Sequence, residues 1–318
     1  MGIVNPTEVH PGIMRALYRL CVRLPPDFAA TTEGFVNVLA PRTAIDRGNA
    51  PRLSAERTVK EAVSIGFLES ADDGRFSLAL PRPPKRASEQ AADAFFAHQL
   101  RRLVLSERNN EPLFQLGSAE DDGDDDDPVE EADGQALSAN HAREFTRILC
   151  WLLLQDPVRP PLEWTGPPDH NVQLKQGQYD GRNLVSNNNR WVNFRRWSQF
   201  LGFARENGKN GLIPDPTVAV HDALAALDLG KPDLPIVELR IRLAEVLPVI
   251  DGGTYRREVL GHVGVEESPD TASASLSMAF MRLQAAGVIT LERRADYRGG
   301  LLVVGNQPFT HVVIGAST

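Results

Sequence analysis

The residues best suited to chemistry in this sequence are the bases of the segment 171–211, which are interleaved with aromatic side chains. Its seven bases, set against only two acids, are Lys175, Arg182, Arg190, Arg195, Arg196, Arg205 and Lys209. Guanidinium groups pair with phosphates and with guanine edges, so this composition favours contact with nucleic acid. Helical spacing over 189–201 places Trp197 in the core and predicts that Arg195 and Arg196 face outward together. The predicted contacts with double-stranded DNA in this segment are Arg190, Arg195, Arg196 and Lys209.

Enzymatic chemistry has no comparable support in the sequence. There is no Gly-x-Ser-x-Gly elbow, no His-Glu-x-x-His pair, no phosphate-binding Gly-x-x-x-x-Gly-Lys loop and no dinucleotide fingerprint. The seven histidines are scattered, and none has a second His or Cys at the helical spacing that metal ligation requires. The acids Asp233 and Glu238 resemble half of a metal-nuclease site, but the lysine that such a site needs is missing. We therefore expect a protein without catalytic activity, cofactor or metal.

The charge of the chain is concentrated in one place. Ten acids lie between Glu120 and Asp133 without an intervening base, and they account for the formal net charge of −8. Like charges at this density repel one another and bury no apolar area, so a disordered loop is expected over 118–135. This acidic loop is either a solvated spacer or an acidic mimic that competes with DNA for the protein's own basic surface. The spacing of an EF-hand calcium loop is absent.

A pattern of helices, a glycine and a hairpin organises the chain and occurs three times. In unit 1, residues 1–86, helices are expected over 13–24, 33–39 and 55–65, the last one after an N-cap at Ser54. Gly66 ends the third helix, and an Asp-Gly turn joins two strands at 67–69 and 75–80. We expect the region 87–136 to hold an amphipathic bridging helix over 88–108, followed by the acidic loop.

The other two copies of the pattern differ in clarity. Unit 3, residues 231–318, is clear: helices are expected over 236–249, 255–262 and from 270 or 271 to Gly287, followed by a hairpin of 288–292 with 301–304. Unit 2, residues 137–230, is weaker, with helices over 142–154 and 189–201, Gly202, and a polar turn at 206–211 before a strand that Pro214 cuts short. This order is typical of winged helix-turn-helix units. The predicted fold is mainly α with small β-hairpins, arranged as three tandem winged helices.

The third helices of units 1 and 3 predict different roles. Unit 1 offers Arg57 and Lys60 on its third helix and Arg75 in its hairpin as further DNA contacts. Arg57 and Glu61 are also spaced i, i+4, and a surface ion pair explains them equally well. The third helix of unit 3 carries a single base, Arg282, among Ser, Ala and Met residues, which favours a surface for protein docking or self-association over DNA binding. The alternative for unit 3 is a purely structural role.

The cellular setting follows from cysteine use and hydropathy. Cys21 and Cys150 lie far apart in apolar helical patterns, which excludes a disulfide framework and favours a reducing cytoplasm. The longest apolar run, 148–154, is too short to span a bilayer, and the N-terminus lacks the pattern of a signal peptide.

The opening Ile3-Val4-Asn5-Pro6-Thr7, the immediate helix over 15–24, and the unit ending Gly66-Phe67-Leu68-Glu69 resemble tandem winged-helix proteins of bacterial anti-phage defence clusters. Among these, the chain is most similar to the DpdG accessory proteins of the deazapurine-in-DNA modification and restriction system. The resemblance covers the architecture of the whole chain and carries over no catalytic residue. It implies a non-enzymatic subunit that works beside helicase, ATPase or nuclease subunits. The cation-poor third helix of unit 3 predicts that such partners dock through unit 3.

Two functions of different classes follow from these observations. The first is a DNA-binding accessory subunit that holds duplex DNA for partner enzymes, which the basic segment 171–211 favours. The alternative is a protein-interaction scaffold like the winged-helix subunits of SMC-type complexes, which the acidic loop and the cation-poor helix of unit 3 favour. A transcriptional regulator is a third option, weakened by the lack of an evident sensor domain.

Overall fold

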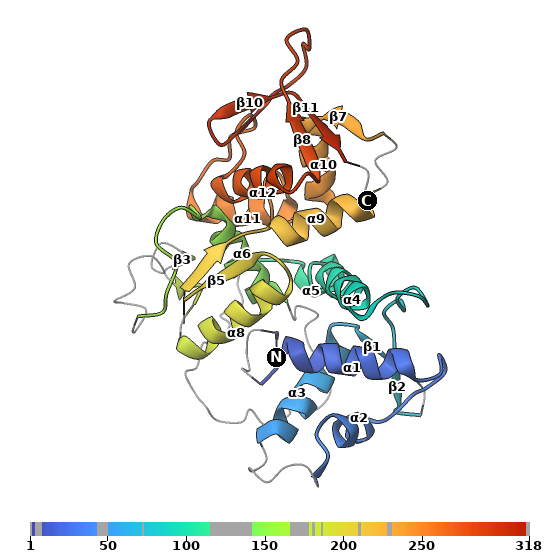
Figure 1. The fold of residues 1–318 in the computed structure, drawn as a ribbon. Coiled ribbons are helices and arrows are strands. Elements are labelled where there is room, and N and C mark those ends of the chain that lie inside the picture. The colour runs from blue at the N-terminus through green and yellow to red at the C-terminus, as the bar shows by residue number, and fades with distance from the viewer. Residues whose placement is uncertain are drawn as a thin grey trace.

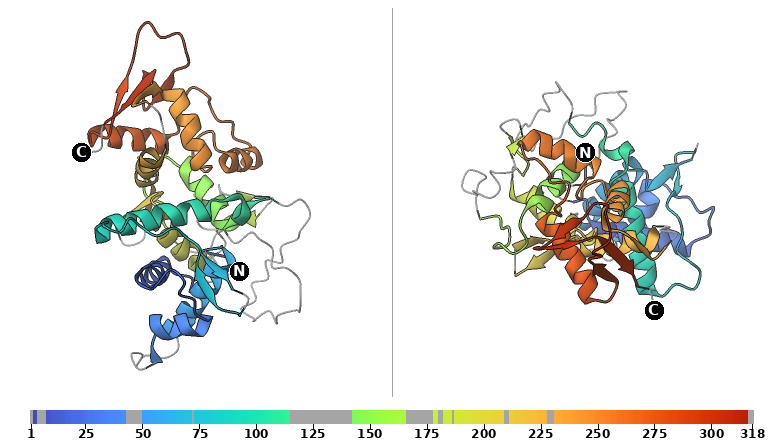
Figure 2. Two further views of the ribbon diagram at one scale, coloured as in Figure 1. Left: turned by 90° about the vertical axis from the view of Figure 1, so that its right-hand side faces the viewer. Right: turned by 90° about the horizontal axis from the view of Figure 1, so that it is seen from above.

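The computed structural model describes residues 2–3, 8–42, 50–71, 73–114, 142–165, 178–179, 182–185, 187–208, 211–227 and 231–315. Three groups of helices, each with a small sheet, are stacked along the long axis of the molecule, with unit 1 at one end and unit 3 at the other (Figures 1 and 2). The expectation of a mainly helical chain with small antiparallel hairpins is confirmed. The acidic loop lies outside the described residues. Within the part of the chain that is described, no helix combines the length and apolar character needed to cross a membrane.

Unit 1 follows its sequence pattern closely. Its elements are α1 (Pro11–Arg23), α2 (Thr32–Leu39), α3 (Ala50–Ser64), β1 (Leu68–Ser70) and β2 (Phe76–Leu78). The two strands pair antiparallel with Leu68 opposite Leu78, as the Asp-Gly turn predicts. The expected start of the third helix after Ser54 is wrong, because α3 begins at Ala50. Pro51 falls in its first turn, where the missing N–H of proline leaves no hydrogen bond unmade.

A bridging helix joins units 1 and 2, as expected. It divides into α4 (Glu89–Val104) and the short α5 (Glu107–Asn110), and Ser88 caps α4 by accepting the N–H of Ala91 at 3.2 Å. Unit 2 then contains α6 (Arg143–Leu154), β3 (Gln178–Tyr179), β4 (Arg182–Asn183), α8 (Asn188–Phe200), β5 (Ala204–Asn207) and β6 (Gly211–Pro214). Strands β5 and β6 form the hairpin expected after Gly202. Helix α9 (Thr217–Ala226) connects this hairpin to unit 3.

Unit 3 departs from its sequence pattern in the pairing of its strands. Its elements are β7 (Asp233–Pro235), α10 (Ile236–Val246), α11 (Thr254–Val263), α12 (Ala274–Ala285), β8 (Ile289–Glu292), β9 (Leu302–Val304), β10 (Gln307–Phe309) and β11 (His311–Ile314). The expected hairpin of 288–292 with 301–304 is wrong, because β8 pairs with β11 while β9 pairs with β10. A two-residue turn, Gly305 and Asn306, joins β9 to β10. A hairpin of β8 with β9 would instead need the much longer loop 293–301. Helix α12 also begins later than expected, with Ser273 as its N-cap.

The helices that precede the hairpins, α3, α8 and α12, end in the same way. Gly66, Gly202 and Gly287 have φ values of +83°, +78° and +74°, a backbone region that glycine adopts without a steric penalty. The next residue in each unit donates its N–H five residues back, over 2.8, 2.9 and 2.9 Å. The carbonyl of that same residue then accepts a bond from the residue that closes the sheet, namely Ala79, Asp215 and Gly315, at 3.1, 2.9 and 2.8 Å. Strand β11 therefore takes the place that β2 and β6 hold, and β9–β10 is an insertion.

Each hairpin also gains a third, edge partner on the same side. Ala30 pairs with Phe76 in unit 1, and Leu162 pairs with Leu212 in unit 2. In unit 3 the partner is β7, which pairs with β11. All three sheets therefore share the order edge segment, second hairpin strand, first hairpin strand. The edge segment follows the first helix in units 1 and 2, whereas it precedes the first helix in unit 3.

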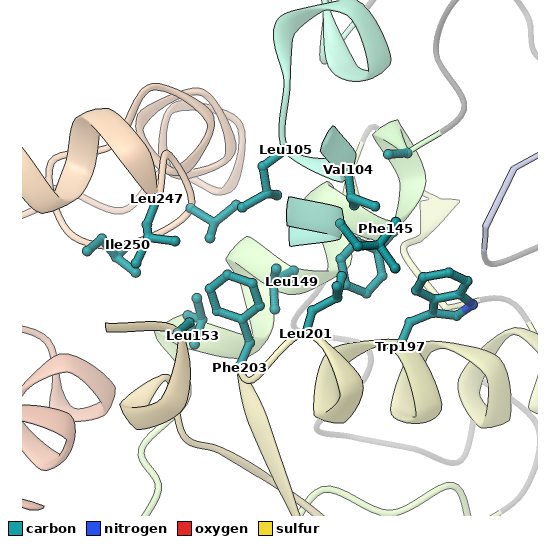
Figure 3. Packing of buried hydrophobic residues seen from close by; sticks show 14 of the residues in the cluster. Val104, Leu105, Phe145, Leu149, Leu153, Trp197, Leu201, Phe203, Leu247 and Ile250 are labelled. Carbon is teal, nitrogen blue, oxygen red and sulfur yellow. The ribbon is translucent and has the colours of Figure 1, made fainter. Parts of the chain in front are cut away.

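One continuous hydrophobic core links the units. Figure 3 shows where they meet: Val104 and Leu105 at the end of α4, Phe145, Leu149 and Leu153 of α6, and Trp197, Leu201 and Phe203 around the end of α8, with Leu247 and Ile250 of unit 3 beside them. Side chains from four segments far apart in the sequence are buried against one another here. The units are thus layers of one folded body.

Candidate nucleic-acid interface

Helix α8 carries three of the four cations that the sequence singles out in unit 2, namely Arg190, Arg195 and Arg196. Asn187 caps it by accepting the N–H of Arg190 at 2.9 Å, and Trp191, Phe194 and Trp197 are all buried. The Trp197 indole donates its N–H to the carbonyl of Val9 at 3.2 Å. The prediction that Trp197 belongs to the core is confirmed. An indole buried in this way is not a platform for stacking bases.

The two central arginines of α8 face different ways. Arg195 is buried, with 9% of its surface exposed, and its guanidinium forms an ion pair with Glu206 of β5. Arg196 is exposed. The prediction that both face outward is wrong, because consecutive helical residues are about 100° apart and β5 lies against one of the two directions. Burial, and then the charge of Arg196, lowers the pKa of the nearby His10.

The other two predicted contacts of unit 2 are Arg190 and Lys209. Arg190 pairs with Glu144 of α6 at 3.0 Å and is mostly covered. Lys209 lies outside the described residues. Among the predicted contacts of unit 2 that the structure describes, Arg196 alone is exposed and has no ion-pair partner in the described part of the chain.

Each predicted cation of unit 1 lies beside a carboxylate, and Lys60 and Arg75 are exposed while Arg57 is half-buried. Arg57 pairs with Glu8 at 2.7 Å, and Lys60 pairs with Glu56 one helical turn before it at 3.1 Å. The alternative pairing of Arg57 with Glu61 is wrong, because Glu61 is on the buried face of α3. Arg75 pairs with Asp73 in the hairpin turn. Exposed ion pairs contribute roughly 0–1 kcal/mol, so a phosphate can displace these carboxylates at little cost.

The N-terminal segment fills the space between α3 and α8. The carbonyl of Ile3 accepts the Asn193 side-chain N–H of α8 at 2.8 Å. On the other side, the Thr58 hydroxyl of α3 donates to the carbonyl of Glu8 at 3.3 Å and accepts the N–H of His10 at 3.2 Å. Ile3 and Val9 are fully buried. This segment, together with α1 and α6, covers α8 on several sides.

Helix α12 is covered on its inner side. The Ser275 hydroxyl donates to the carbonyl of Leu153 at the end of α6 at 2.6 Å, and Arg282 pairs with the buried Asp215 before α9. The small residues that suggest a docking surface therefore serve, in their first half, as packing within the chain. Met281 remains 55% exposed on the outer face. Docking of a partner protein through unit 3 stays a prediction.

Among the buried arginines that the sequence did not single out are Arg101 and Arg256. Arg101 of α4 donates to the carbonyl of Leu201 at 2.6 Å and to Asp222 of α9 at 3.1 Å. Arg256 of α11 lies between Asp251 and Glu267 at 3.3 and 2.7 Å. Burial lowers the pKa of Arg101, and Asp222 opposes that shift. The one signal in the sequence was the position of Arg101 next to Leu100, on the apolar side of an amphipathic helix.

The acids that resembled a nuclease site are not brought together around a shared centre. Asp233 pairs with Arg294 at 3.0 Å, and Glu238 pairs with Arg242 one turn later on α10. Among the described residues, no group of three or more His, Cys, Asp or Glu side chains is arranged to hold a metal ion. Cys21 and Cys150 are both free thiols in the core.

Comparison with known protein families gives a match over most of the chain. A family model described as DpdG-like covers residues 1–297. No curated protein and no solved structure matches the chain. The match fits a component of a deazapurine-in-DNA modification system and agrees with the resemblance seen in the N-terminal unit. Since the matched region spans nearly the whole sequence, the chain belongs to the DpdG-like family.

Proposed function

We propose that this chain is a non-enzymatic, DNA-binding accessory subunit of a deazapurine-in-DNA modification system, built from three winged-helix units. The observation that carries the proposal is a structural repeat. In each unit a helix ends at a glycine of positive φ and is followed by a hairpin with a third, edge segment, and the capping hydrogen bonds are the same in all three copies. That arrangement is the one in which a third helix is presented to the major groove of duplex DNA. Membership of the DpdG-like family supports the same function.

Unit 1 is the unit through which we propose that DNA is bound. Its third helix α3 keeps Arg57 and Lys60 at the surface, and Arg75 stands in the adjoining hairpin. Helix α8 is covered by other parts of the chain, and the one cation of α12, Arg282, is paired with Asp215, so the proposed role of both helices is to hold the stack together. Arg196 is the one residue of unit 2 that we keep as a candidate contact.

Duplex binding measured by fluorescence anisotropy across a salt series tests this assignment. The Arg57→Ala/Lys60→Ala variant should bind unrelated duplexes more weakly, and the slope of log K against log salt should fall in magnitude by about 0.9 for each phosphate that the variant no longer neutralises. Lys231→Ala/Arg240→Ala is the matched control, because it removes the same charge from unit 3. Equal slopes for both variants and the wild-type chain would overturn the role of α3, and a single Arg196→Ala variant then tests unit 2.

A second candidate function is a winged-helix interaction scaffold. The observation that favours it is that α8 and α12 pack against other parts of the same chain. In two of the units, the helix that would otherwise face DNA thus makes contacts with protein. The two candidates separate in one experiment. If the folded wild-type chain fails to bind duplex DNA at low salt, where phosphate contacts are strongest, the DNA-binding function is wrong and the scaffold replaces it.

A further inference from the structure

A cavity of about 160 Å³ lies between α4, α9 and α10, away from the surface of α3. Helix α4 contributes His98, Arg101 and Arg102 to its lining, and Ala223, Leu227 and Leu247 are among its apolar walls. Helices α4 and α9 contact each other at this point, with α4 below α9 in the view of Figure 1. An engineered cavity of about 150 Å³ holds a benzene molecule, so this one is large enough for a small polyatomic ligand.

The positive charge of the cavity is only partly compensated. His98, Arg101 and Arg102 are spaced i, i+3 and i+4, which places them on one face of α4. Arg101 uses Nε and Nη2 for Leu201 and Asp222, while its Nη1 is buried and has no hydrogen-bond partner among the described residues. Arg102 is exposed and has no ion-pair partner in the described part of the chain. The carboxylate of Asp222 is already engaged by Arg101.

We propose that this cavity is a binding site for a phosphate-like oxyanion, held by Arg102 and His98 with Arg101 beneath them. Guanidinium groups bind phosphate oxygens through charge-assisted hydrogen bonds, and the apolar walls exclude water from the remaining sides. The C-terminal ends of α9 and α10 border the cavity, and their partial negative charge stabilises the guanidinium groups when it is empty. An anion competes with that charge, so a modest affinity is expected.

Histidine protonation gives the site a pH dependence of definite sign. Burial lowers the pKa of His98 most, and Arg101 and Arg102 lower it further, against the opposing effect of Asp222. His221 of α9 also lies near Asp222, at 3.5 Å. His98 is therefore neutral at neutral pH in the empty site. A bound anion stabilises the imidazolium, so binding takes up a proton and tightens as the pH falls.

Calorimetry on the full chain with inorganic phosphate and with sulfate tests the site. Removing one charge-assisted hydrogen bond in Arg102→Ala should weaken binding about tenfold or more, and Ala226→Phe should block the cavity without removing a charge. The control Arg23→Ala removes an exposed cation elsewhere and should leave affinity unchanged. Sulfate binding should strengthen from about pH 8 to about pH 6, and His98→Gln should flatten that dependence. No binding, or equal binding by all variants, would overturn the proposal.

Two sources supply the same chemistry, a free phosphate compound and the terminal phosphate of a DNA strand. Short oligonucleotides with either a 5′-phosphate or a 5′-hydroxyl end distinguish them. A preference for the phosphorylated end that Arg102→Ala abolishes identifies the strand end. Equal binding of both ends, together with binding of inorganic phosphate, identifies a free phosphate compound. The site stands apart from α3, so loss of duplex binding in the unit 1 variants leaves this proposal unaffected.

Discussion

Replacing the three helix-ending glycines by alanine should separate backbone strain from steric crowding. All three have positive φ, and an alanine there costs roughly 1–2 kcal/mol from the left-handed backbone alone. A Cβ at Gly287 meets nothing within 4 Å, so Gly287→Ala should lose only that amount. At Gly66 the added Cβ comes within 2.8 Å of the Arg108 guanidinium, but Arg108 is exposed and can move away.

Gly202 is different because one of its close neighbours is backbone, which cannot move aside as an exposed side chain can. An added Cβ would lie 2.9 Å from Val218 Cγ1 and 3.1 Å from the backbone nitrogen of Ala219, at the start of α9. Overpacking of this kind adds roughly 1–3 kcal/mol, so Gly202→Ala should lose roughly 2–5 kcal/mol in total. The expected order of destabilisation is therefore Gly202, then Gly66, then Gly287.

Urea unfolding followed by tryptophan fluorescence and circular dichroism measures these differences. One continuous core predicts a single transition seen equally by both probes. The control is Gly261→Ala inside α11, where φ is not positive and nothing lies within 4 Å, so alanine should stabilise by up to about 1 kcal/mol. If Gly287→Ala proves as costly as Gly202→Ala, the reasoning from local crowding is refuted.

Three other outcomes are expected. Asp222→Asn should destabilise the chain by roughly 3–5 kcal/mol in urea unfolding, because it leaves the buried guanidinium of Arg101 without its counter-charge, and an unchanged midpoint would contradict the buried pair. Burial raises the pKa of the Cys21 thiol to about 11 and that of Cys150 further, so neither should react with an alkylating reagent at neutral pH until urea unfolds the chain, and prompt labelling of the folded protein would count against this packing. Deleting 118–135 removes ten acids and should strengthen duplex binding at low salt if the acidic loop competes with DNA, whereas unchanged binding would identify it as a spacer.

The parts of the fold that sequence reasoning predicts are those set by local chemistry. Apolar periodicity and capping residues give the expected helices to within a few residues, and the Asp-Gly turn gives the hairpin of unit 1, whereas α9 was not expected. The pairing of β8 with β11 was missed because it joins segments separated by an inserted hairpin, and either strand could close the sheet by composition alone. The start of α3 was expected too late in the sequence, because Pro51 is compatible with a linker as well as with the first turn of a helix.

The site was harder to predict because burial there depends on distant partners. Arg195 and Arg196 are adjacent and chemically identical, and the difference between them comes from Glu206 on the following strand. The covering of α8 depends on Ile3 and Val9, which reach it from the other end of the sequence. Composition identified the cation-rich segment, but it could not indicate which cations the rest of the chain would neutralise.

The repeated capping geometry and the different surroundings of α3, α8 and α12 point to different roles for the three units. A helix that reads the major groove needs an open face with free cations. The bonds to Ile3 and Val9 remove much of that face from α8, and the one cation of α12, Arg282, is already paired with Asp215. Exposing that face of α8 would require breaking buried contacts of the shared core. The ion pairs around α3 are solvent-accessible, so phosphates can replace their carboxylates at little cost in free energy. In the proposed function, units 2 and 3 therefore form a rigid support that fixes the orientation in which unit 1 binds DNA.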